Sequence, residues 1–437
     1  MEQGKQFVKF VVPSIVSMWI FSLYTIVDGI FVARGVGEAA LASVNLSIPY
    51  VQCIFAVGLL FGTGTSTVVA ICLGRGEQKK ALQYFNQNLF LLICFSLCLT
   101  AFTLLELEPI ARFLGASGDT LNYTMEYVRT ISVFAVFFIV SYNLEVLVKT
   151  NGAPHVSAIG VASCGIMNVL LDYVFVMHFH WGIRGAAFAT GLSQLTSTAV
   201  FVCYFLRHRE KLHFGRFSFD LSIYRRILPI GLADGMTELS AGITTFLFNQ
   251  MILRVIGSVG IVSYTIVSYV NTLVLMTMTG LTQGMQPLVS YHYGREQPQV
   301  YLRFLRDGLV VSSCLAVLSF VLVLLGADRI TGIFIKDPDS ALFRYSAHAL
   351  RVYARAFLLM GANVVMAGFF AAVERPRYSL AISLGRGLVI ITLSLLLMAA
   401  LFGEAGIWNS PLVSEALCLV VTGLLARRHF RQERLRT

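Results

Sequence analysis

Long apolar segments recur along the whole chain and restrict it to one class of fold. The first runs from Phe7 to Ala33, and as a helix it would be roughly 40 Å long, enough to cross a bilayer with some tilt. Because hydrocarbon offers no water to free backbone groups, such segments must be helices. We expect an all-α polytopic membrane protein with twelve transmembrane helices, in the ranges 7–33, 44–72, 82–105, 122–148, 155–178, 185–206, 225–252, 261–291, 304–326, 342–372, 377–401 and 407–426.

The composition supports this class. Of 437 residues, 57% are hydrophobic and 13% are charged, whereas a soluble domain has about 25% charged residues. The net charge of +10 does not indicate nucleic-acid binding, because the basic residues lie between the apolar segments and form no single patch. We therefore expect the lipid bilayer and small molecules as partners, and no nucleic acid. The eight cysteines lie in apolar runs without a C-x-x-C pair, which is typical of small buried side chains and of neither disulfides nor a metal site.

The basic residues also predict the orientation. If the N-terminus is inside, 22 of the 33 Lys and Arg residues fall in inside segments and 8 in outside segments. This bias places both termini in the cytoplasm of a multi-pass protein in a bacterial plasma membrane, the inner membrane where there are two. The first apolar segment is too long for a signal peptide and lacks a cleavage site, so we expect it to be retained.

The chain repeats itself at an offset of about 220 residues. The stretch LGRGE (73–77) after the second span resembles YGRE (293–296) after the eighth, and Pro13 and Pro229 open corresponding spans. The second copy begins six spans after the first. Because six is an even number, both copies have the same orientation in the membrane and are parallel repeats related by an axis along the membrane normal. We expect two pseudosymmetric six-helix bundles, residues 1–210 and 211–437, separated by the polar connector around 207–224. Parallel repeats of this kind are more typical of transporters than of channels or enzymes.

Two carboxylates within spans of the first bundle, Asp28 and Asp172, have no acidic counterpart in the second. Asp28 corresponds to Asn249 in the second copy, and Asp172 follows Asn168 by four residues on one helix face. A carboxylate inside hydrocarbon costs about 2.5–3.5 kcal/mol at a helix centre, so such residues usually face a polar cavity. With Thr190 they form an all-oxygen set that could bind a proton between two acids, or coordinate Na⁺ at Asp28 and Asp172. The alternatives are a polar core that joins helices, or an Asp28 close enough to the interface to be hydrated.

A second acidic pair lies in the seventh span. Asp234 and Glu238 are four residues apart, and Glu238 falls near the middle of the span. Glu238 could contact a cation in the cleft between the bundles. Alternatively, the pair could neutralise one of three arginines that fall inside spans, Arg351, Arg355 and Arg386.

Two ion pairs are also predicted. Glu415 is expected to pair with Arg386, and Glu145 with Lys149 one helical turn further on. The 33 Phe, 17 Tyr and 13 Met residues suit a soft cavity that repacks around varied guests, although the sequence does not identify those that line it.

Four motifs carry a resemblance to a known family: Pro13 followed by IVDGIFVARGVGEAALAS, CLGRGEQKKA after the second span, MNVLLDYVFV in the fifth span and IRGAAFATGLSQ in the sixth. In this order and register, the chain resembles the multidrug and toxic compound extrusion (MATE) transporters of the MOP superfamily over nearly its whole length. It looks closest to the bacterial branch of MepA-type and DinF-type pumps. The resemblance implies efflux of cationic or amphiphilic organic compounds, driven by H⁺ or Na⁺ and without a further cofactor.

The resemblance also assigns residues. The cation site of the family corresponds to Asp28, Asn168, Asp172 and Thr190, and a span-four asparagine of the family corresponds to Asn143. Its helix-bending proline corresponds to Pro13, and its helix-seven glutamate to Glu238. An aspartate that some members carry in helix ten is absent, because this chain has Asn363 in that span.

We therefore predict a secondary active exporter, acting as a monomer and not an enzyme, that alternates access between two lobes. Ion binding at Asp28 and Asp172 would let the first helix bend at Pro13 and collapse the drug site. One alternative is a lipid-linked oligosaccharide flippase, which would need a strongly cationic cleft. Another is a membrane prenyltransferase-type enzyme, which would need two facing acidic metal motifs, whereas NVLLD occurs once. Oxygen ligands suit both H⁺ and Na⁺, so the sequence does not choose between them.

Overall fold

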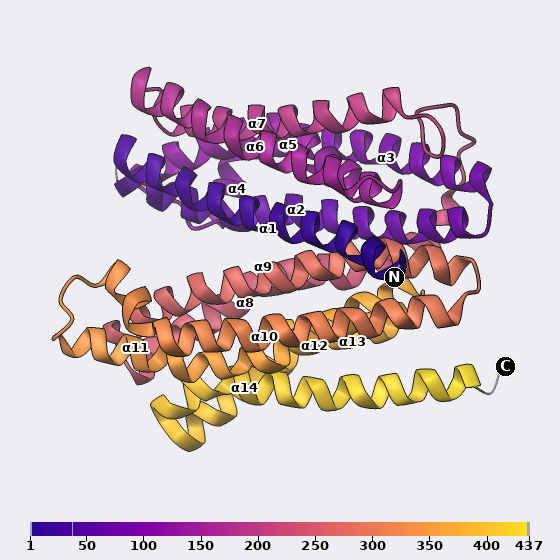
Figure 1. The fold of residues 1–437 in the computed structure, drawn as a ribbon. Coiled ribbons are helices and arrows are strands. Elements are labelled where there is room, and N and C mark those ends of the chain that lie inside the picture. Colours follow the sequence, from indigo (N-terminus) through magenta and orange to yellow (C-terminus); the bar gives the residue numbers. More distant parts are fainter. Residues whose placement is uncertain (1, 37, 435–437) are drawn as a thin grey trace.

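The computed structural model describes residues 2–36 and 38–434, and in these ranges regular structure consists of helices alone. Figure 1 shows two helical bundles, which we call lobe one and lobe two. Lobe one contains, in chain order, α1 (Glu2–Gly35), α2 (Glu38–Gly74), α3 (Gln78–Leu105), α4 (Leu107–Phe113), α5 (Asp119–Thr150), α6 (Pro154–Asp172), the π-helical η1 (Tyr173–His178) and α7 (Gly182–Arg207).

Lobe two follows after an extended connector that ends in a short 3₁₀ turn. Its elements are η2 (Leu221–Ile223), α8 (Tyr224–Val255), α9 (Ser258–Gly294), α10 (Pro298–Phe334), α11 (Ala341–Tyr353), η3 (Ala354–Ala356), α12 (Phe357–Ala372), α13 (Pro376–Leu384), the π-helical η4 (Gly385–Val389) and α14 (Ile390–Arg434). Gly403 interrupts α14 with a φ of 57°, so α14 consists of two helical rods that meet at this residue.

The predicted all-α architecture with twelve long helical rods is confirmed for the described residues. Ten segments are long and apolar enough to cross a membrane, and the last of them, Pro376–Gln432 with 57 residues, holds the two rods that meet at Gly403. The acid-bearing α8, with 32 residues, is not among these ten. Most helices extend beyond the predicted ends, because an apolar pattern marks only the part of a helix that lies in hydrocarbon.

The region 106–121 differs from the sequence analysis, which places no helix there. It contains α4, a single amphipathic stretch in which Arg112 pairs with Glu108 at 2.8 Å. Seven residues are too few for a membrane span, and the i, i+4 ion pair stabilises the short helix locally.

Backbone conformation confirms the repeat at single residues. Gly76 ends the turn after α2 with a φ of 76°, and Glu296, its counterpart after α9, has a φ of 57°. In the same way, Gly152 before α6 (φ 98°) corresponds to Glu374 before α13 (φ 54°). Left-handed backbone favours glycine, so lobe two keeps the turn geometry of lobe one although the residue type has changed.

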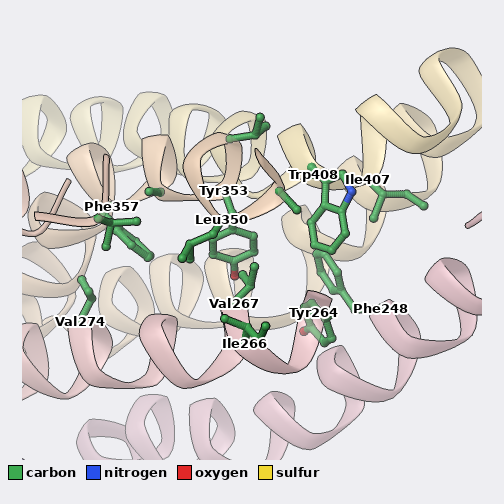
Figure 2. Close-up of a cluster of buried hydrophobic side chains, with 14 of the residues drawn as sticks. Phe248, Tyr264, Ile266, Val267, Val274, Leu350, Tyr353, Phe357, Ile407 and Trp408 are labelled. Atoms are coloured by element: carbon green, nitrogen blue, oxygen red, sulfur yellow. The ribbon is translucent and has the colours of Figure 1, made fainter. Parts of the chain in front are cut away.

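The beginning of α1 and the end of α14 lie at the same end of the molecule (Figure 1), which we call the terminal end; the opposite end is the distal end. In the distal half each lobe has its own apolar core. Figure 2 shows that of lobe two, where the rings of Phe248 and Tyr264 stack with centroids 5.3 Å apart near the indole of Trp408. The corresponding core of lobe one, around Ile54 and Val176, contains lobe-one residues only.

In the terminal half the apolar cores are shared between the lobes. Phe7, Phe10 and Val11 of α1 belong to a cluster whose other buried members come from lobe two, and the Phe7 ring stacks on Phe304 of α10 at 6.3 Å. A second cluster joins Phe85 of lobe one to Ile227 of α8. The lobes are thus packed together at the terminal end and separate at the distal end.

Candidate functional site

Three adjoining cavities lie between the lobes, from the centre of the molecule towards the distal end. Their volumes are about 140 Å³ at the centre, about 170 Å³ on the lobe-two side and about 680 Å³ in the distal half. Phe21 and Tyr24 of α1 line both the central and the distal cavity, and Glu238 of α8 lines all three. We call these connected cavities the cleft.

Between the cleft and the terminal end, glycines allow the backbones of the two lobes to come into contact. A Cβ atom on Gly231 would lie 1.7 Å from the carbonyl oxygen of Leu60, so no side chain fits there. The contacts occur in pairs that the repeat relates: Gly231 to Leu60 and Gly280 to Ile15, Gly64 to Ile227 and Gly284 to Val11, Gly74 to Tyr291 and Gly294 to Ile71. All lie in the terminal halves of α1, α2, α8 and α9. The structure is therefore closed at the terminal end.

The lobe-one acids come together as predicted. Asp28 lines the distal cavity, and Thr190 of α7 approaches its Oδ1 at 3.5 Å. The side chains of Asp172 and Asn168, both on α6, also interact with the Asp28 carboxyl group. Three helices thus bring two carboxylates, an amide and a hydroxyl to one place at the wall of the cleft.

The environment of this group is largely dry. Asp172 and Asn168 are fully buried, and their polar side-chain atoms find no hydrogen bond of ordinary geometry among the described residues. Two adjacent carboxylates cannot both stay charged at low cost in such a site, because like charges repel and burial disfavours ionisation. A bound proton or small cation would remove this conflict.

The helix that carries Asp172 changes character immediately after it. α6 ends at Asp172 and continues as the π-helical turn η1 from Tyr173. A π-turn inserts one residue into the helical register and is frequent at functional sites. In lobe two a π-helical turn occurs at 385–389, which is not the position that corresponds to η1. The two lobes therefore differ in backbone as well as in charge at this point.

Pro13 lies inside the unbroken helix α1. Its missing N–H removes one backbone hydrogen bond, and Ser17 donates its hydroxyl to the Pro13 carbonyl at 2.9 Å. Val11 and Ile15, two residues before and two residues after Pro13, contact Gly284 and Gly280 of α9. The weakened turn thus lies where α1 packs against lobe two.

The acids of α8 line the cleft, and among the described residues neither forms an ion pair with an arginine. Asp234 and Glu238 line the cavity on the lobe-two side. The proposed pairing with one of three arginines is wrong for two of them: Arg351 pairs with Asp328 at 2.6 Å and Arg386 with Glu415 at 2.7 Å. In the part of the chain that the structure describes, no ion pair joins the third, Arg355, to either acid.

The two predicted local ion pairs are confirmed. Besides Arg386 and Glu415, Lys149 bonds to Glu145 at 2.8 Å, with both side chains buried. Asn363 is also structural, because its amide donates to Glu415 Oε2 at 2.7 Å. At the position where some members of the family carry an aspartate in helix ten, this chain thus has an uncharged residue that bonds to Glu415 within lobe two.

One residue of the predicted set lies elsewhere. Asn143 is buried in the terminal third of α5, with its backbone against Gly62, and no hydrogen bond connects it to Asp28. The same helix instead brings Tyr127 to the site. Tyr127 lines the distal cavity and is close enough to Asp28 and Asp172 for an electrostatic interaction with both. Nothing in the sequence separates Tyr127 from the other sixteen tyrosines.

The structure describes all eight cysteines, and none forms a disulfide. Three are buried as expected, but Cys53, Cys94, Cys98, Cys203 and Cys314 are exposed. The expectation of burial is wrong for these five because an apolar run does not tell a lipid-facing position from a packed one. Within the described residues, no three His, Cys, Asp or Glu side chains group as metal ligands.

Comparison with known proteins gives a family match in two parts. The MatE family model matches residues 13–174 and 236–398, one stretch in each lobe. The chain belongs to the MatE family. The multidrug export protein MepA of Staphylococcus saprophyticus is 25% identical over 425 residues, which cover 96% of this chain and 93% of that protein. MepA of Staphylococcus haemolyticus is 26% identical over 420 residues, covering 95% and 91%.

Solved structures share the MatE fold. A multidrug resistance MATE family transporter of the MOP superfamily, in an outward-facing conformation, superposes with a TM-score of 0.93 at 21% identity, covering 98% of this chain and 96% of that one. A MOP superfamily transporter from Pyrococcus furiosus, described as having a binding pocket of reversed polarity, gives 0.91 at 21% identity with the same coverage. Since MATE proteins are transporters, this chain is a multi-pass membrane transporter and not an enzyme.

Proposed function

We propose that this MatE protein is a secondary active exporter of cationic or amphiphilic organic compounds, driven by the inward movement of H⁺ or Na⁺. The observation that carries the proposal is the pair Asp28 and Asp172 at the wall of the cleft, where Asp172 is fully buried and Asp28 is half-buried. A neutralising cation is required there, and the site adjoins the space that a substrate would occupy. The names of the MepA relatives, multidrug export proteins, agree with this class of substrate.

The polarity of the cleft supports cationic substrates. Its charged lining consists of four acids, Asp28, Glu145, Asp234 and Glu238, and one base, Arg386. Arg386 is paired with Glu415 and Glu145 with Lys149, so the charged groups of the lining that have no ion-pair partner among the described residues are three acids, Asp28, Asp234 and Glu238. A flippase for pyrophosphate-linked sugars would need the opposite polarity, so we do not favour that alternative.

The orientation gives the cycle its direction. The positive-inside bias assigns the terminal end to the cytoplasm. A cleft closed at the terminal end then faces outward, and this state would release substrate and take up the ion. Ion binding at Asp28 and Asp172 would relieve their repulsion, let α1 bend at Pro13 and drive the return to the inward-facing state.

Transport by the purified protein tests this proposal. In proteoliposomes, ethidium movement is measured under an imposed pH gradient and, separately, under an imposed sodium gradient. One gradient should drive movement in the wild type. Asp28→Asn and Asp172→Asn should each reduce it to background, because each variant lacks one of the two carboxylates whose repulsion the ion relieves. Asp339→Asn, in an exposed distal loop, is the control and should transport normally.

The gradients also identify the ion. A response to the pH gradient alone assigns H⁺, and a response to the sodium gradient alone assigns Na⁺. Full gradient-driven transport by Asp28→Asn would refute the assignment of the site, provided that both variants are folded and inserted to the same level.

A further inference from the structure

A second charged group lies at the floor of the cleft and has no part in the cycle described so far. Glu145 and Lys149 are one turn apart on α5, with exposed fractions of 6% and 0%. The Lys149 ammonium donates to Glu145 Oε1 at 2.8 Å, and the Ser157 hydroxyl of α6 donates to the same oxygen at 3.0 Å. Removing two charges from water is costly, so stabilisation by the ion pair alone does not explain why both residues are buried here.

The pair also connects the two lobes. Lys149 donates to Gln283 Oε1 of α9 at 3.1 Å, and Gln283 in turn donates to the Tyr142 hydroxyl of α5 at 3.1 Å. Lys149 therefore has one partner in its own lobe and one in lobe two. Any movement that separates the lobes at the terminal end must break the bond to Gln283.

Glu145 is also part of the cleft. It lines the central cavity of about 140 Å³, and Glu238 lines the same cavity from lobe two. Aromatic side chains, among them Phe21 and Phe138, form much of the wall between them. Within the described residues, Glu145 Oε2 accepts no hydrogen bond. The cavity therefore offers two carboxylates from opposite lobes and an apolar surround, which suits an organic cation.

Lys149 lies closer to the terminal end than Glu145 does, because α5 runs from the distal end to Thr150. In the closed structure it is sealed from solvent. Opening at the terminal end would remove Gln283 and admit water to the ammonium group first. In water the attraction between Lys149 and Glu145 falls by severalfold relative to the protein interior.

We propose that Glu145 is a binding site for the charged group of an organic-cation substrate, and that Lys149 is a tethered cation that competes for it when the terminal end is closed. This proposal rests on the proposed export function and adds the step at which the affinity of the cleft for substrate changes. With the terminal end open, Lys149 is hydrated and Glu145 attracts substrate. When the lobes close, Gln283 and burial return Lys149 to Glu145, and the substrate is displaced towards the distal opening.

Equilibrium binding of tetraphenylphosphonium to the purified full-length protein in nanodiscs tests the proposal. Lys149→Met removes the competitor and should tighten binding by about tenfold, while transport in proteoliposomes slows because release is impaired. Glu145→Gln should weaken binding by about tenfold, because Lys149 then adds an unpaired positive charge to the cavity. Unchanged or weaker binding by Lys149→Met would overturn the proposal.

A second variant keeps both charges, in case Lys149→Met does not fold. Gln283→Leu removes only the lobe-two partner of Lys149 and should tighten binding by about threefold. Ser290→Ala is the control: it lies two turns further along α9, lines none of the three cavities, bonds within lobe two to the Ala372 carbonyl at 3.1 Å, and should bind as the wild type. Equal binding by Gln283→Leu and Ser290→Ala would also refute the competition.

The two proposals fail differently. If the wild type neither binds nor transports the probe, the export function itself is wrong. If the wild type transports and Asp28→Asn does not, while Lys149→Met and Gln283→Leu bind like the wild type, only the role of Glu145 and Lys149 is excluded.

Discussion

Gly231→Ala should open the terminal end of the molecule. The new methyl group would lie 1.7 Å from the Leu60 carbonyl oxygen and 2.6 Å from its carbon. Contacts shorter than 3.0 Å are essentially never seen for real Cβ atoms, and a backbone carbonyl cannot rotate away like a flexible side chain. Helices α8 and α2 must therefore separate by at least about 1.3 Å at this point, and α8 and α2 belong to different lobes.

The size of the effect follows from the cost of overpacking. Adding one methyl group to a closely packed contact typically costs about 1–3 kcal/mol. The cost applies only to the state in which the lobes touch here, so it shifts the equilibrium between closed and open terminal ends by about 5- to 150-fold towards the open one. Stability within each lobe should change little, because the contact lies between lobes.

Pulsed electron paramagnetic resonance can measure this shift. Spin labels on non-natural amino acids at positions 79 and 299 report the separation of exposed terminal-end sites in the two lobes and leave the native cysteines in place. Gly231→Ala should move population from the short to a longer distance. Gly406→Ala is the matched control, because its Cβ would meet the Met398 carbonyl oxygen at 1.9 Å within lobe two. An unchanged distance distribution in Gly231→Ala, with lowered thermal stability, would refute the reasoning.

Three further outcomes are expected. Phe357→Ala should lower the thermal unfolding midpoint, since removing this fully buried ring costs about 3–5 kcal/mol, whereas Phe113→Ala, at 90% exposure, should not. Glu415→Gln should cost about 3–5 kcal/mol by leaving Arg386 buried without its carboxylate, and the same midpoint measures it. In the connector, hydrogen bonds from Ser222 hold the pKa of Asp220 below its usual value. This local anchor is present above the unfolded pKa and is lost as pH falls through the lower folded value, so the protection of the Ser222 amide against hydrogen exchange should fall only in acid.

The sequence predicts the fold well because its strongest constraint acts on long segments. A bilayer requires about twenty apolar residues for each helical span, and a repeat of about 220 residues is visible even though few positions are identical. The same signal cannot find α4, which is too short and too polar to resemble a span. It also cannot place Gly231 against Leu60, because a glycine in an apolar run indicates neither which face it occupies nor what it meets.

For the site, charge is the informative property. Asp28 and Asp172 are recognisable because hydrocarbon tolerates so few carboxylates, and the structure brings them together. Asn143 and Tyr127 show the limit of this reasoning. Both are uncharged residues of α5, and only their depth along the helix determines which of them reaches Asp28. The link from Lys149 to Gln283 depends on how the two lobes dock, which local pattern does not encode.

The paired glycine contacts have a consequence for the origin of the chain. Where Gly74 meets Tyr291, their repeat counterparts Gly294 and Ile71 meet in the same way, so residue i of one half touches residue j of the other and the reverse is also true. This is the reciprocal pattern of an isologous homodimer interface. A single six-helix ancestor could therefore have assembled with a second copy of itself through the same surface, before gene fusion joined the copies and allowed acids at the positions of Asp28 and Asp172 to persist in only one of them.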